Sequence, residues 1–470
     1  MPDTLWQWAD LVAAAQGEAD GAPALRVAGF CIDTRSLAPG DVFVALKDAR
    51  DGHEFVPAAF KAGAAAAIVA RSYPRGGTGA LIRVANPLRA LEAIGRAARA
   101  RANARIAAIT GSVGKTGTKE MLRLALAAAG SIHAAEKSYN NHWGVPLTLA
   151  RMPADTQYAV CEIGMNHPGE ITPLAEMVRP HVAVITTVEP VHLGYFGSVE
   201  AIAEAKAEIF TGLVPGGTAV LPRDNAHFPL LRERASAVGA GILTFGYHEE
   251  ADIRALQLDA GPKGSSVVAG HGSQRFPYRV GAPGEHYVKN SLAVLAALIA
   301  LGADPMRCLP ALARISAPVG RGARTLLEVP DGQILLIDES YNANPASVAA
   351  ALGAMAATPR EVFPRRVAAL GDMLELGDSA AELHRSLKVA VDAAGIDLVL
   401  ACGPMMRLLL DDLAPARQGA WAPTSAELAP ALVAAVQAGD VVMIKGSLGT
   451  RMAPLVEAVL ARFGPGKPGG

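Results

Sequence analysis

One short segment, Thr110-Gly111-Ser112-Val113-Gly114-Lys115-Thr116, constrains the fold of this 470-residue chain more than any other feature. It lies between a run expected to form a strand, 105–110 (RIAAIT), and a helix expected over 115–129. Glycines let the backbone curl so that several N–H groups face one anion, and the helix N-terminus adds partial positive charge. We therefore predict a phosphate-binding loop made of Gly111, Ser112, Val113, Gly114, Lys115 and Thr116.

Lys115 and Thr116 are the loop residues expected to do chemistry. The lysine can reach the β- and γ-phosphates as a point charge, and the threonine hydroxyl can bind Mg²⁺. The usual spacing G-x-x-x-x-G-K-[ST] would need glycine at Ile109, so this loop is a variant that begins at Gly111. The alternative, a solvated turn, is disfavoured because Gly-Lys-Thr directly follows a strand and opens a helix. We expect a nucleoside triphosphate ligand.

Composition excludes several classes of protein. Lys+Arg 43 against Asp+Glu 44 leaves no basic excess to neutralise nucleic acid, and the 51% hydrophobic content can fill several cores. No secretory signal opens the sequence, and the longest apolar stretch, 292–303, is too short to span a bilayer and fits a buried helix. The four cysteines are widely spaced, which favours a reducing compartment. We expect a cytoplasmic protein with no nucleic-acid partner and no membrane insertion.

Two turn-rich breaks, 73–79 (YPRGGTG) and 317–322 (APVGRG), divide the chain. Boundaries near 85 and 318 predict three domains: 1–85, 86–317 and 318–470. Short apolar runs separated by helical segments predict mainly parallel sheets covered by helices. These runs are 158–163 and 182–187 in the central domain, and 334–338, 366–370, 398–401 and 441–445 in the last. The fold class is therefore α/β, with a small N-terminal α/β domain, a central phosphate-loop ATPase domain and a Rossmann-like C-terminal domain.

Three further side chains are candidates for the site. Glu162 ends the run 158–163 and His192 follows the run 182–187, so both are expected at the sheet edge where open α/β folds bind ligands. Mg²⁺ prefers oxygen ligands. An exposed strand-end carboxylate and a packed histidine are the plainer interpretations. Lys206, on a helix expected over 201–210, is by itself typical of a charged helix face.

Several segments, in order along the whole chain, resemble the Mur ligases of peptidoglycan synthesis. They are 110–116, 140–149 (NNHWGVPLTL), 161–171 (CEIGMNHPGEI), 192–198 (HLGYFGS), 205–210 (AKAEIF) and 338–345 (DESYNANP). The segments 33–36 (DTRS), 39–46 (PGDVFVAL), 371–377 (GDMLELG) with His384, and 445–447 (KGS) resemble the dipeptide-adding subgroup. Relatives that add lysine or diaminopimelate carry Asp-Asn-Pro-Arg, where this chain has Tyr341-Asn342-Ala343-Asn344-Pro345-Ala346.

The resemblance implies a ligase for cell-wall precursors that uses ATP and Mg²⁺. It would join D-alanyl-D-alanine to UDP-N-acetylmuramoyl-tripeptide through an acyl phosphate, releasing ADP and phosphate. The N-terminal domain would hold the UDP, the central domain ATP, and the C-terminal domain would close to admit the amine. We expect these two substrates as partners, and a monomer.

The resemblance also assigns roles to single residues. It implies that Lys115, His192 and Lys206 are catalytic, and that Lys206 can be carbamylated. Thr116, Glu162 and His192 would support the metal. Nucleotide contacts would come from the loop together with Asn290, Arg321 and Asp338. Substrate contacts would come from Thr34, Arg35, Ser36, Asn140, Asn141, Asn342, Asn344 and Lys445.

The chain departs from the family pattern at three places, and two rival functions stay open. Leu448 stands where arginine is expected, with Arg451 able to replace its charge, Thr450 replaces methionine, and Gly117 replaces serine. One rival is a folylpolyglutamate-synthetase-like or cyanophycin-type ligase, which the segment 33–36 disfavours. The other is a nucleotide switch, although the sequence has no Asn/Thr-Lys-x-Asp guanine reader. The sequence leaves open the third peptide residue and the base that accepts the amine proton.

Overall fold

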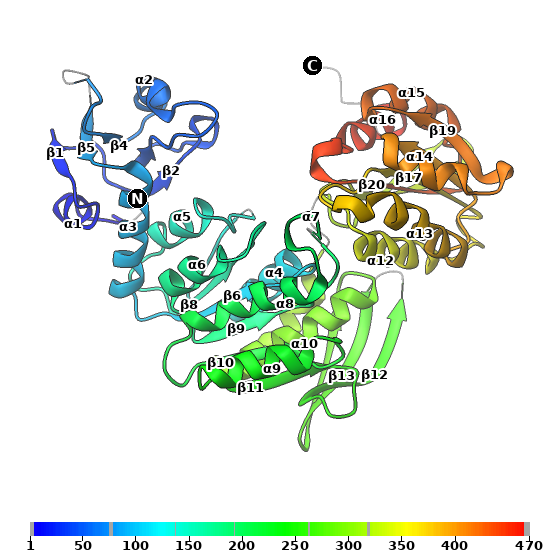
Figure 1. The fold of residues 1–470 in the computed structure, drawn as a ribbon, viewed down its shortest axis with the longest axis horizontal. Coiled ribbons are helices and arrows are strands. Elements are labelled where there is room, and N and C mark those ends of the chain that lie inside the picture. The colour runs from blue at the N-terminus through cyan, green and yellow to red at the C-terminus, as the bar shows by residue number, and fades with distance from the viewer. Residues whose placement is uncertain are drawn as a thin grey trace.

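The computed structural model describes residues 4–74, 79–136, 138–191, 193–261, 264–316 and 320–464. These residues form three lobes, each built on its own sheet, and the lobes make an open crescent (Figure 1). The sheets span residues 18–84, 105–280 and 323–445, so each lies within one of the three segments expected from the sequence. The α/β fold class with mainly parallel sheets is as predicted. The exact domain boundaries stay predictions, because 75–78 and 317–319 lie outside the described residues.

The N-terminal lobe is a five-stranded sheet of order β1-β5-β4-β3-β2, parallel except for β1. Its strands are β1 (Glu18–Asp20), β2 (Gly29–Cys31), β3 (Asp41–Val44), β4 (Ala66–Ala70) and β5 (Ala80–Val84), with helices α1 (Trp8–Ala14) and α2 (Val56–Lys61). All of β3 and all but the last residue of β4 are buried, as expected of strands covered on both faces.

Two helices join this lobe to the central one: α3 (Pro87–Arg101) and α5 (Gly144–Ala150). A single buried cluster contains Phe30 of the N-terminal sheet, Leu91 of α3 and Leu147 of α5. The Trp6 Nε1 atom donates to the Ala150 carbonyl at 3.0 Å, and the Arg151 guanidinium donates to the Phe30 carbonyl at 2.7 Å. The two lobes therefore share one continuous apolar core.

The central lobe has a nine-stranded sheet of order β14-β13-β12-β11-β10-β9-β6-β8-β7. Its strands are β6 (Arg105–Thr110), β7 (Ile132–Ala134), β8 (Tyr158–Glu162), β9 (Val182–Ile185), β10 (Thr218–Pro222), β11 (Gly241–Gly246), β12 (Ile253–Gly261), β13 (Gly264–His271) and β14 (Gln274–Val280). Strands β6 to β12 pair in parallel, whereas β12, β13 and β14 form an antiparallel ribbon. Residues along β14 are alternately exposed and buried over most of its length. The sequence of the ribbon therefore indicates strands less clearly than the apolar runs of the parallel strands do.

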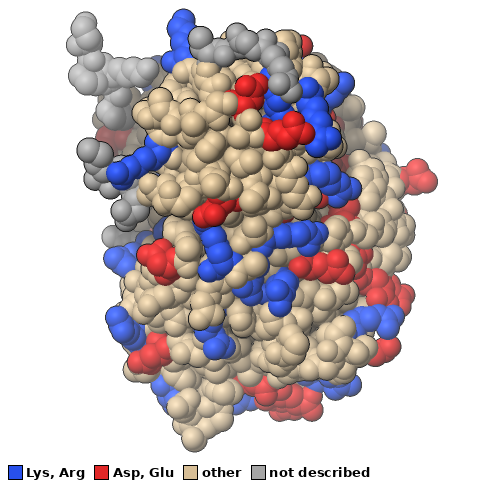
Figure 2. Space-filling view, turned by 90° about the vertical axis from the view of Figure 1, so that its left-hand side faces the viewer, with Lys and Arg blue, Asp and Glu red and all other residues tan. Residues whose placement is uncertain are grey.

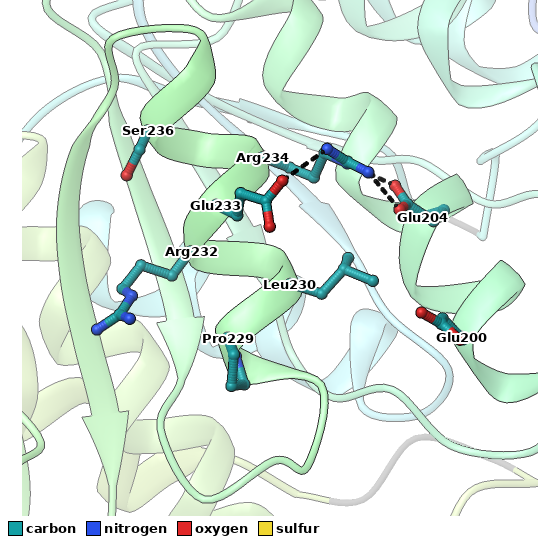
Figure 3. Close-up of a pocket in the computed structure, with 8 residues that line it drawn as sticks. All are labelled: Glu200, Glu204, Pro229, Leu230, Arg232, Glu233, Arg234 and Ser236. Carbon is teal, nitrogen blue, oxygen red and sulfur yellow. Dashed lines mark hydrogen bonds and ion pairs between the residues drawn. The ribbon is translucent and has the colours of Figure 1, made fainter.

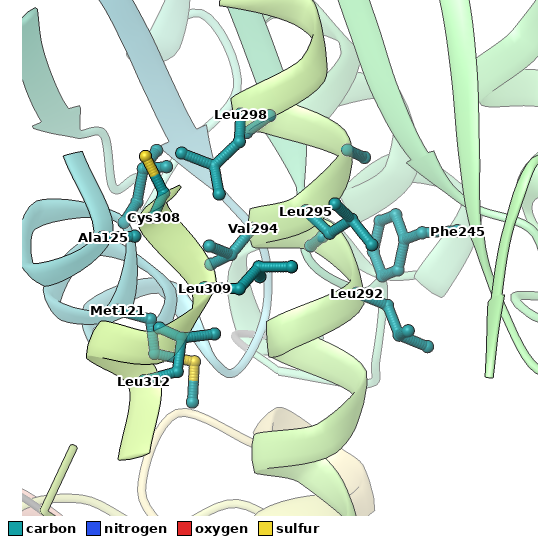
Figure 4. Close-up of a cluster of buried hydrophobic side chains, with 14 of the residues drawn as sticks. Met121, Ala125, Phe245, Leu292, Val294, Leu295, Leu298, Cys308, Leu309 and Leu312 are labelled. Atoms are coloured by element: carbon teal, nitrogen blue, oxygen red, sulfur yellow. The ribbon is translucent and has the colours of Figure 1, made fainter. Parts of the chain in front are cut away.

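The helices of the central lobe are α4 (Lys115–Leu126), α6 (Ile171–Val178), α7 (Leu193–Phe196), α8 (Val199–Ala207), α9 (Phe228–Ala237), α10 (Glu285–Ala300) and α11 (Pro305–Cys308). Helix α10 is the buried apolar helix predicted from 292–303, and Leu292, Leu295 and Leu298 pack into the main core (Figure 4). Helix α8 is shorter than the predicted 201–210, because the chain tightens into a 3-10 turn over Glu208–Gly212.

The C-terminal lobe has a six-stranded sheet of order β15-β16-β20-β17-β18-β19, parallel except for β15. Its strands are β15 (Ala323–Val329), β16 (Gly332–Glu339), β17 (Arg365–Gly371), β18 (Leu398–Cys402), β19 (Gln418–Ala422) and β20 (Asp440–Lys445). The helices are α12 (Pro345–Ala356), α13 (Ala380–Ala393), α14 (Pro404–Asp411), α15 (Ser425–Ala435) and α16 (Ala453–Phe463). Helices cover both faces of the sheet, as in dinucleotide-binding folds (Figure 1).

Surface and helix properties add two observations. On the face shown in Figure 2, lysines and arginines are interspersed with aspartates and glutamates. Within the described residues, no helix combines the length and the apolar character that crossing a membrane requires.

Candidate active site

The loop between β6 and α4 has the shape of a phosphate cradle. Gly111 has φ +148° and Gly114 has φ +86°, conformations that residues with a Cβ rarely adopt. A Cβ on Gly111 would also overlap the hydroxyl of Thr186, which donates to the Val113 carbonyl at 2.5 Å. Gly111 and Gly114 therefore allow the loop to curl, and Gly111 also allows it to pack closely against Thr186, just after β9.

Lys115 begins α4 and lies folded back on its own loop. Its Nζ donates to the Gly111 carbonyl at 2.6 Å. Burial lowers the pKa of Lys115, the nearby Glu162 carboxylate opposes this, and the positive charge of Arg321 lowers it further. An arginine from the C-terminal lobe is thus near enough to act on this lysine.

Glu162 and Thr116 meet beneath the loop, at the carboxyl edge of β8. The Thr116 hydroxyl donates to Glu162 Oε2 at 3.0 Å and is 3.2 Å from the Ser138 hydroxyl. Asn140 donates from Nδ2 to the other carboxylate oxygen, Oε1, at 2.8 Å. Glu162 is 1% exposed, so it is not the exposed strand-end carboxylate of the plainer interpretation.

Lys206 is buried on α8 with 2% of its surface exposed. Burial, and then the charge of Lys115, lower its pKa well below the ordinary value. Among the described residues no hydrogen-bond or ion-pair partner is found for its ammonium group. The interpretation as an exposed, charged helix face is therefore wrong, because the Lys206 side chain is buried inside the protein.

His192, expected near the metal, lies outside the described residues. Strand β9 ends at Ile185, before His192 in the sequence, and α7 begins at Leu193. Within the part of the chain that the structure describes, no group of three or more His, Cys, Asp or Glu side chains is placed to hold a metal ion. Thr116 and Glu162 are the predicted metal ligands that the structure brings together.

The other residues predicted to contact the nucleotide come from α10 and from the C-terminal lobe. Asn290 of α10 is so close to Gly114 that a Cβ there would be 2.7 Å from its Oδ1. The Arg321 guanidinium lies 4.1 Å from the centre of the Tyr341 ring, and Tyr287 of α10 donates to the Arg321 carbonyl at 3.2 Å. Asp338, at the end of β16, accepts bonds from Gly320 N at 2.9 Å and the Ser340 hydroxyl at 2.6 Å.

The substrate residues predicted in the C-terminal lobe have local partners. Lys445 Nζ is 3.1 Å from Glu339 Oε2 and 3.0 Å from the Asn342 carbonyl. Asn344 caps the N-terminus of α12 by accepting from Ser347 N at 2.8 Å. Leu448, which replaces the expected arginine, is 62% exposed at the same edge of the sheet.

Thr450, a second departure from the family pattern, also lies at this edge, as does Arg451, which could replace the missing charge. Arg451 adopts φ +52° just beyond Leu448, and its side chain is exposed. The Thr450 hydroxyl donates to the Ser447 carbonyl at 2.6 Å. Asn342 uses its Oδ1 to accept from the next backbone amide, Ala343 N, at 2.9 Å.

In the N-terminal lobe, the predicted Thr34, Arg35 and Ser36 form a 3-10 turn after β2. Arg35 is highly exposed and pairs with Asp33 at 2.7 Å. Asn141, in the central lobe, caps α5 by accepting from Gly144 N at 2.9 Å. The 3-10 turn lies at the same edge of the N-terminal sheet as a cavity, although none of these four residues lines that cavity.

That cavity, of about 500 Å³, opens where β3, β4 and β5 end and meets Trp143 from the central lobe. We call it the junction pocket. Its lining residues are Ala45, Leu46, Lys47, Asp51, His53, Ala70, Ser72, Tyr73, Pro74, Ala85, Asn86, Pro87, Leu88 and Trp143. His53 is held from both sides, by Asp51 at 2.6 Å and by the Ala70 amide at 2.9 Å.

A second cavity, of about 550 Å³, lies between α8 and α9 (Figure 3). Arg234 points across it and pairs with Glu204 at 2.6 Å and with Glu233 at 3.1 Å. Its charges therefore satisfy one another, and no residue of the phosphate loop lines it.

Comparison with known proteins decides the family. The Mur ligase middle domain matches residues 109–298, and the Mur ligase glutamate ligase domain matches residues 326–448. The UDP-N-acetylmuramoyl-tripeptide–D-alanyl-D-alanine ligase of Synechocystis sp. is 36% identical over 93% of this chain and 93% of its own length. The chain belongs to the Mur ligase family.

Solved Mur ligase structures agree with this assignment over the full length. A crystal structure of MurF from Acinetobacter baumannii superposes with a TM-score of 0.84 and 30% identity, covering 98% of this chain and all of that one. MurF ligase from Thermotoga maritima in complex with ADP has a TM-score of 0.77 and 25% identity, covering 93% and 98% of the two chains.

Several residues in and around this candidate site were not found from the sequence. Ser138 and Thr186 hold Thr116 and the loop, Tyr287 and Tyr341 surround Arg321, and Trp143 closes the junction pocket. Ser138 and Trp143 flank Asn140-Asn141 in the sequence, so reading the whole segment 138–143 as one functional loop would have found both.

Proposed function

We propose that this chain is an ATP-dependent ligase that joins D-alanyl-D-alanine to UDP-N-acetylmuramoyl-tripeptide, with ADP and phosphate as the other products. The relatives that carry this activity in their names match the chain along almost its entire length. The observation that carries the chemistry is the glycine-rich phosphate loop itself, with Lys115 at the start of α4 and the Thr116 hydroxyl bonded to the buried Glu162 carboxylate. We also propose a cytoplasmic location, where ATP is available, with these two substrates as partners.

The positive charges of Lys115 and Arg321 offset the repulsion between anions in the first step of the reaction. The carboxylate of the peptide attacks the γ-phosphorus of ATP, the bond to ADP breaks, and an acyl phosphate forms. Two anions must meet, so catalysis is mainly positioning and charge stabilisation. Lys115 and the loop amides grip the transferring phosphoryl group, and Arg321 adds a positive charge from the C-terminal lobe.

In the second step, the neutral amine of D-alanyl-D-alanine attacks the acyl carbon and forms a tetrahedral intermediate. Phosphate then leaves, and a base or water accepts the proton that the amine loses. Water would compete for the acyl phosphate, so the site must close around it. The contact between the Tyr287 hydroxyl and the Arg321 carbonyl joins the central and C-terminal lobes beside the cradle. The C-terminal lobe can therefore cover the site from this side.

The residues around Thr116 fit a bound Mg²⁺. A hydroxyl and a carboxylate are oxygen ligands, and Mg²⁺ needs few of them because it keeps several waters. Thr116 and Glu162 would hold the ion, with His192 as a third contributor. When bound, the ion neutralises charge on the β- and γ-phosphates.

Lys206 has the properties of a lysine that reacts with carbon dioxide. Its lowered pKa favours the neutral amine, whose nitrogen can form a bond to the carbon of CO₂ and lose one proton. The product is a carbamate with a negative charge, which relieves the repulsion from Lys115. We propose that Lys206 acts in this carbamylated form, as a further oxygen donor beside the metal.

The junction pocket has the chemistry to receive the nucleoside end of the UDP-linked substrate. Tyr73 and Trp143 offer aromatic faces for a base, and Lys47 offers charge for a diphosphate. The 3-10 turn with Arg35 lies at the same sheet edge. A substrate held there would extend along the loop 138–143 toward Glu162.

Product mass tests the function. Incubation with ATP, UDP-N-acetylmuramoyl-tripeptide and D-alanyl-D-alanine should give the UDP-linked pentapeptide, with one phosphate released for each product. Substrates with lysine and with diaminopimelate at the third position should be compared. Ligation of glutamate to a folate, with no reaction of the UDP-linked tripeptide, would overturn the proposal in favour of the folylpolyglutamate-type activity.

A further inference from the structure

Both oxygens of the buried Glu162 carboxylate accept hydrogen bonds from neighbouring side chains. Ser138 contacts the Thr116 hydroxyl at 3.2 Å, Thr116 donates to Oε2 at 3.0 Å, and Asn140 donates to Oε1 at 2.8 Å. Thr116 has one proton and gives it to the carboxylate, so the Ser138 hydroxyl donates to Thr116. The carboxylate is therefore fixed from two sides.

Asn140 is itself fixed at its backbone. The Gly164 amide donates to the Asn140 carbonyl at 2.7 Å, and Asn140 N donates to the Ser138 carbonyl at 3.0 Å. A Cβ on Gly164 would lie 3.0 Å from the Asn140 Cγ, tighter than an ordinary van der Waals contact, so this glycine leaves just enough room for the amide. The side-chain amide of Asn140 is thus directed at Glu162 by the chain around it.

We infer that Asn140 is a positioning residue, which acts on the metal and the phosphates through Glu162. A carboxylate alone can turn about its last side-chain bond, and a partial turn would move the nearer oxygen away from Thr116. The Asn140 amide holds Oε1, so Oε2 stays beside the Thr116 oxygen. Groups that orient metal ligands in this way commonly change metal affinity by about 10–100-fold when they are removed.

This inference rests on the proposed function, because it assumes that Thr116 and Glu162 hold the divalent ion of the ATP complex. It also differs from the role implied by family resemblance, in which Asn140 contacts the muramoyl substrate. The amide nitrogen of Asn140 is engaged by Glu162. The two roles make different predictions for metal affinity and for substrate affinity.

The test measures Mn²⁺ binding by electron paramagnetic resonance, in the presence of the non-hydrolysable ATP analogue AMP-PNP. Asn140→Leu keeps the branched shape and removes the donor, and Asn140→Ala provides a second variant with a smaller side chain. We expect both to weaken Mn²⁺ affinity about 10–100-fold. In ligation assays, the Mg²⁺ concentration for half-maximal rate should rise by a similar factor, and high Mg²⁺ should rescue the rate.

A matched control is Gln333→Ala. Gln333 also donates an amide hydrogen bond to a glutamate, Glu328 Oε1 at 2.7 Å, but at an exposed position of the C-terminal lobe. Its removal should leave Mn²⁺ affinity unchanged. A general loss of stability would lower the Tm of a variant without shifting the Mg²⁺ requirement of the folded fraction.

Two results would overturn the inference. One is unchanged Mn²⁺ affinity in both Asn140 variants. The other is a loss confined to the binding of UDP-N-acetylmuramoyl-tripeptide, measured by calorimetry without nucleotide or metal, which would make Asn140 a substrate contact. Failure of the proposed function is separate, because the parent chain would then bind Mn²⁺ and AMP-PNP but make no pentapeptide.

Discussion

Gly194 of α7 and Gly377 of the C-terminal lobe touch through their backbones. A Cβ on Gly194 would lie 3.1 Å from the Gly377 nitrogen, and a Cβ on Gly377 would lie 2.9 Å from the Gly194 Cα. The Gly194 amide also donates to the Glu375 carbonyl at 3.2 Å. Side chains at either position would separate the two lobes at a point two residues from His192.

Alanine at Gly194 should therefore impair ligation more than nucleotide binding. A displacement of about 1 Å at the reacting groups can cost about 10²-fold in rate, so we expect kcat to fall by up to that factor while ADP affinity is kept. Small-angle scattering should show a larger radius of gyration. Gly353→Ala is the control, because a Cβ there meets nothing within 4 Å. Equal kcat in the two variants would show that the contact is incidental.

Alanine at Lys115 should abolish most of the activity and leave the fold intact. The lysine is the cation that the loop presents to the transferring phosphoryl group, and losing one such group costs at least about 10²–10³-fold in kcat. Thermal unfolding should be little changed, because within the described residues the Lys115 side chain makes one hydrogen bond, to the Gly111 carbonyl. Lys388→Ala, at an exposed ion pair with Asp392, is the control. Near-normal turnover without Lys115 would contradict the assignment of the loop.

Lys206 should make stability depend on pH. In the unfolded chain this lysine keeps its proton up to about its ordinary pKa of 10.5, whereas burial lowers the pKa in the folded state. Between the lowered pKa and 10.5, the unfolded state therefore binds more protons than the folded state. The contribution of Lys206 to the free energy of unfolding rises with pH in this window and falls as the pH drops.

Lys206→Met should consequently be more stable than the parent near neutral pH, and the difference should shrink toward 10.5. Urea unfolding in buffers free of carbon dioxide measures this without interference from carbamate. Added bicarbonate should stabilise and activate the parent and leave the methionine variant unchanged. A parent protein with the same pH profile as the variant would show that the amine is not buried as described.

Variants of the ion pair between Lys445 and Glu339 show whether Lys445 stabilises the fold or contacts the substrate. Both side chains are largely buried and 3.1 Å apart, so removing one partner leaves an uncompensated charge and costs about 3 kcal/mol or more. Lys445→Met should therefore lower the Tm, and Lys445→Met with Glu339→Leu should recover much of it. A variant with normal Tm but a raised KM for D-alanyl-D-alanine would instead make Lys445 a substrate contact.

Trp143 gives a test of the junction pocket. Trp143→Ala should weaken the binding of UDP alone and of the UDP-linked tripeptide by the same factor, about 10-fold for the loss of one stacked aromatic face. ADP binding at the phosphate loop should be unaffected. Trp421→Ala, at a half-exposed tryptophan of the C-terminal lobe, is the control. Unchanged UDP affinity would move the nucleoside to another part of the N-terminal lobe.

Sequence patterns predicted the parts of this fold that carry a strong local pattern, such as glycines at a turn or a run of apolar residues. The strand before Gly111 and the helix after Gly114 follow from glycines and apolar runs, and the run 292–303 marks the buried helix α10. The ribbon of β12, β13 and β14 was not predicted, because its strands bury alternate residues and resemble turn-rich surface segments. Thr186 and Thr187 were expected in a strand but turn away from it to bond the loop at Val113 and Ser112.

Such local patterns could not predict hydrogen bonds between site residues that lie far apart in the sequence. Glu162 was expected at a strand end, but neither periodicity nor composition indicates that Asn140, in a loop 22 residues earlier, donates to it. Lys206 shows the same limit. Its neighbours Glu204 and Glu208 suggested a solvated helix face, whereas they turn outward to Arg234 and to the N-terminus of α6 and leave the lysine inside.

The shared core of the first two lobes has a consequence for dissection of this enzyme. Leu147 and Ala150 complete the packing around Phe30 and Leu91, so a fragment that stops near residue 86 would expose an unsealed apolar face. Such a fragment should aggregate on expression, whereas one that ends after the central lobe should stay monodisperse. Grafting a different acceptor-binding module onto this scaffold would therefore require transplanting α3 and α5 together with it.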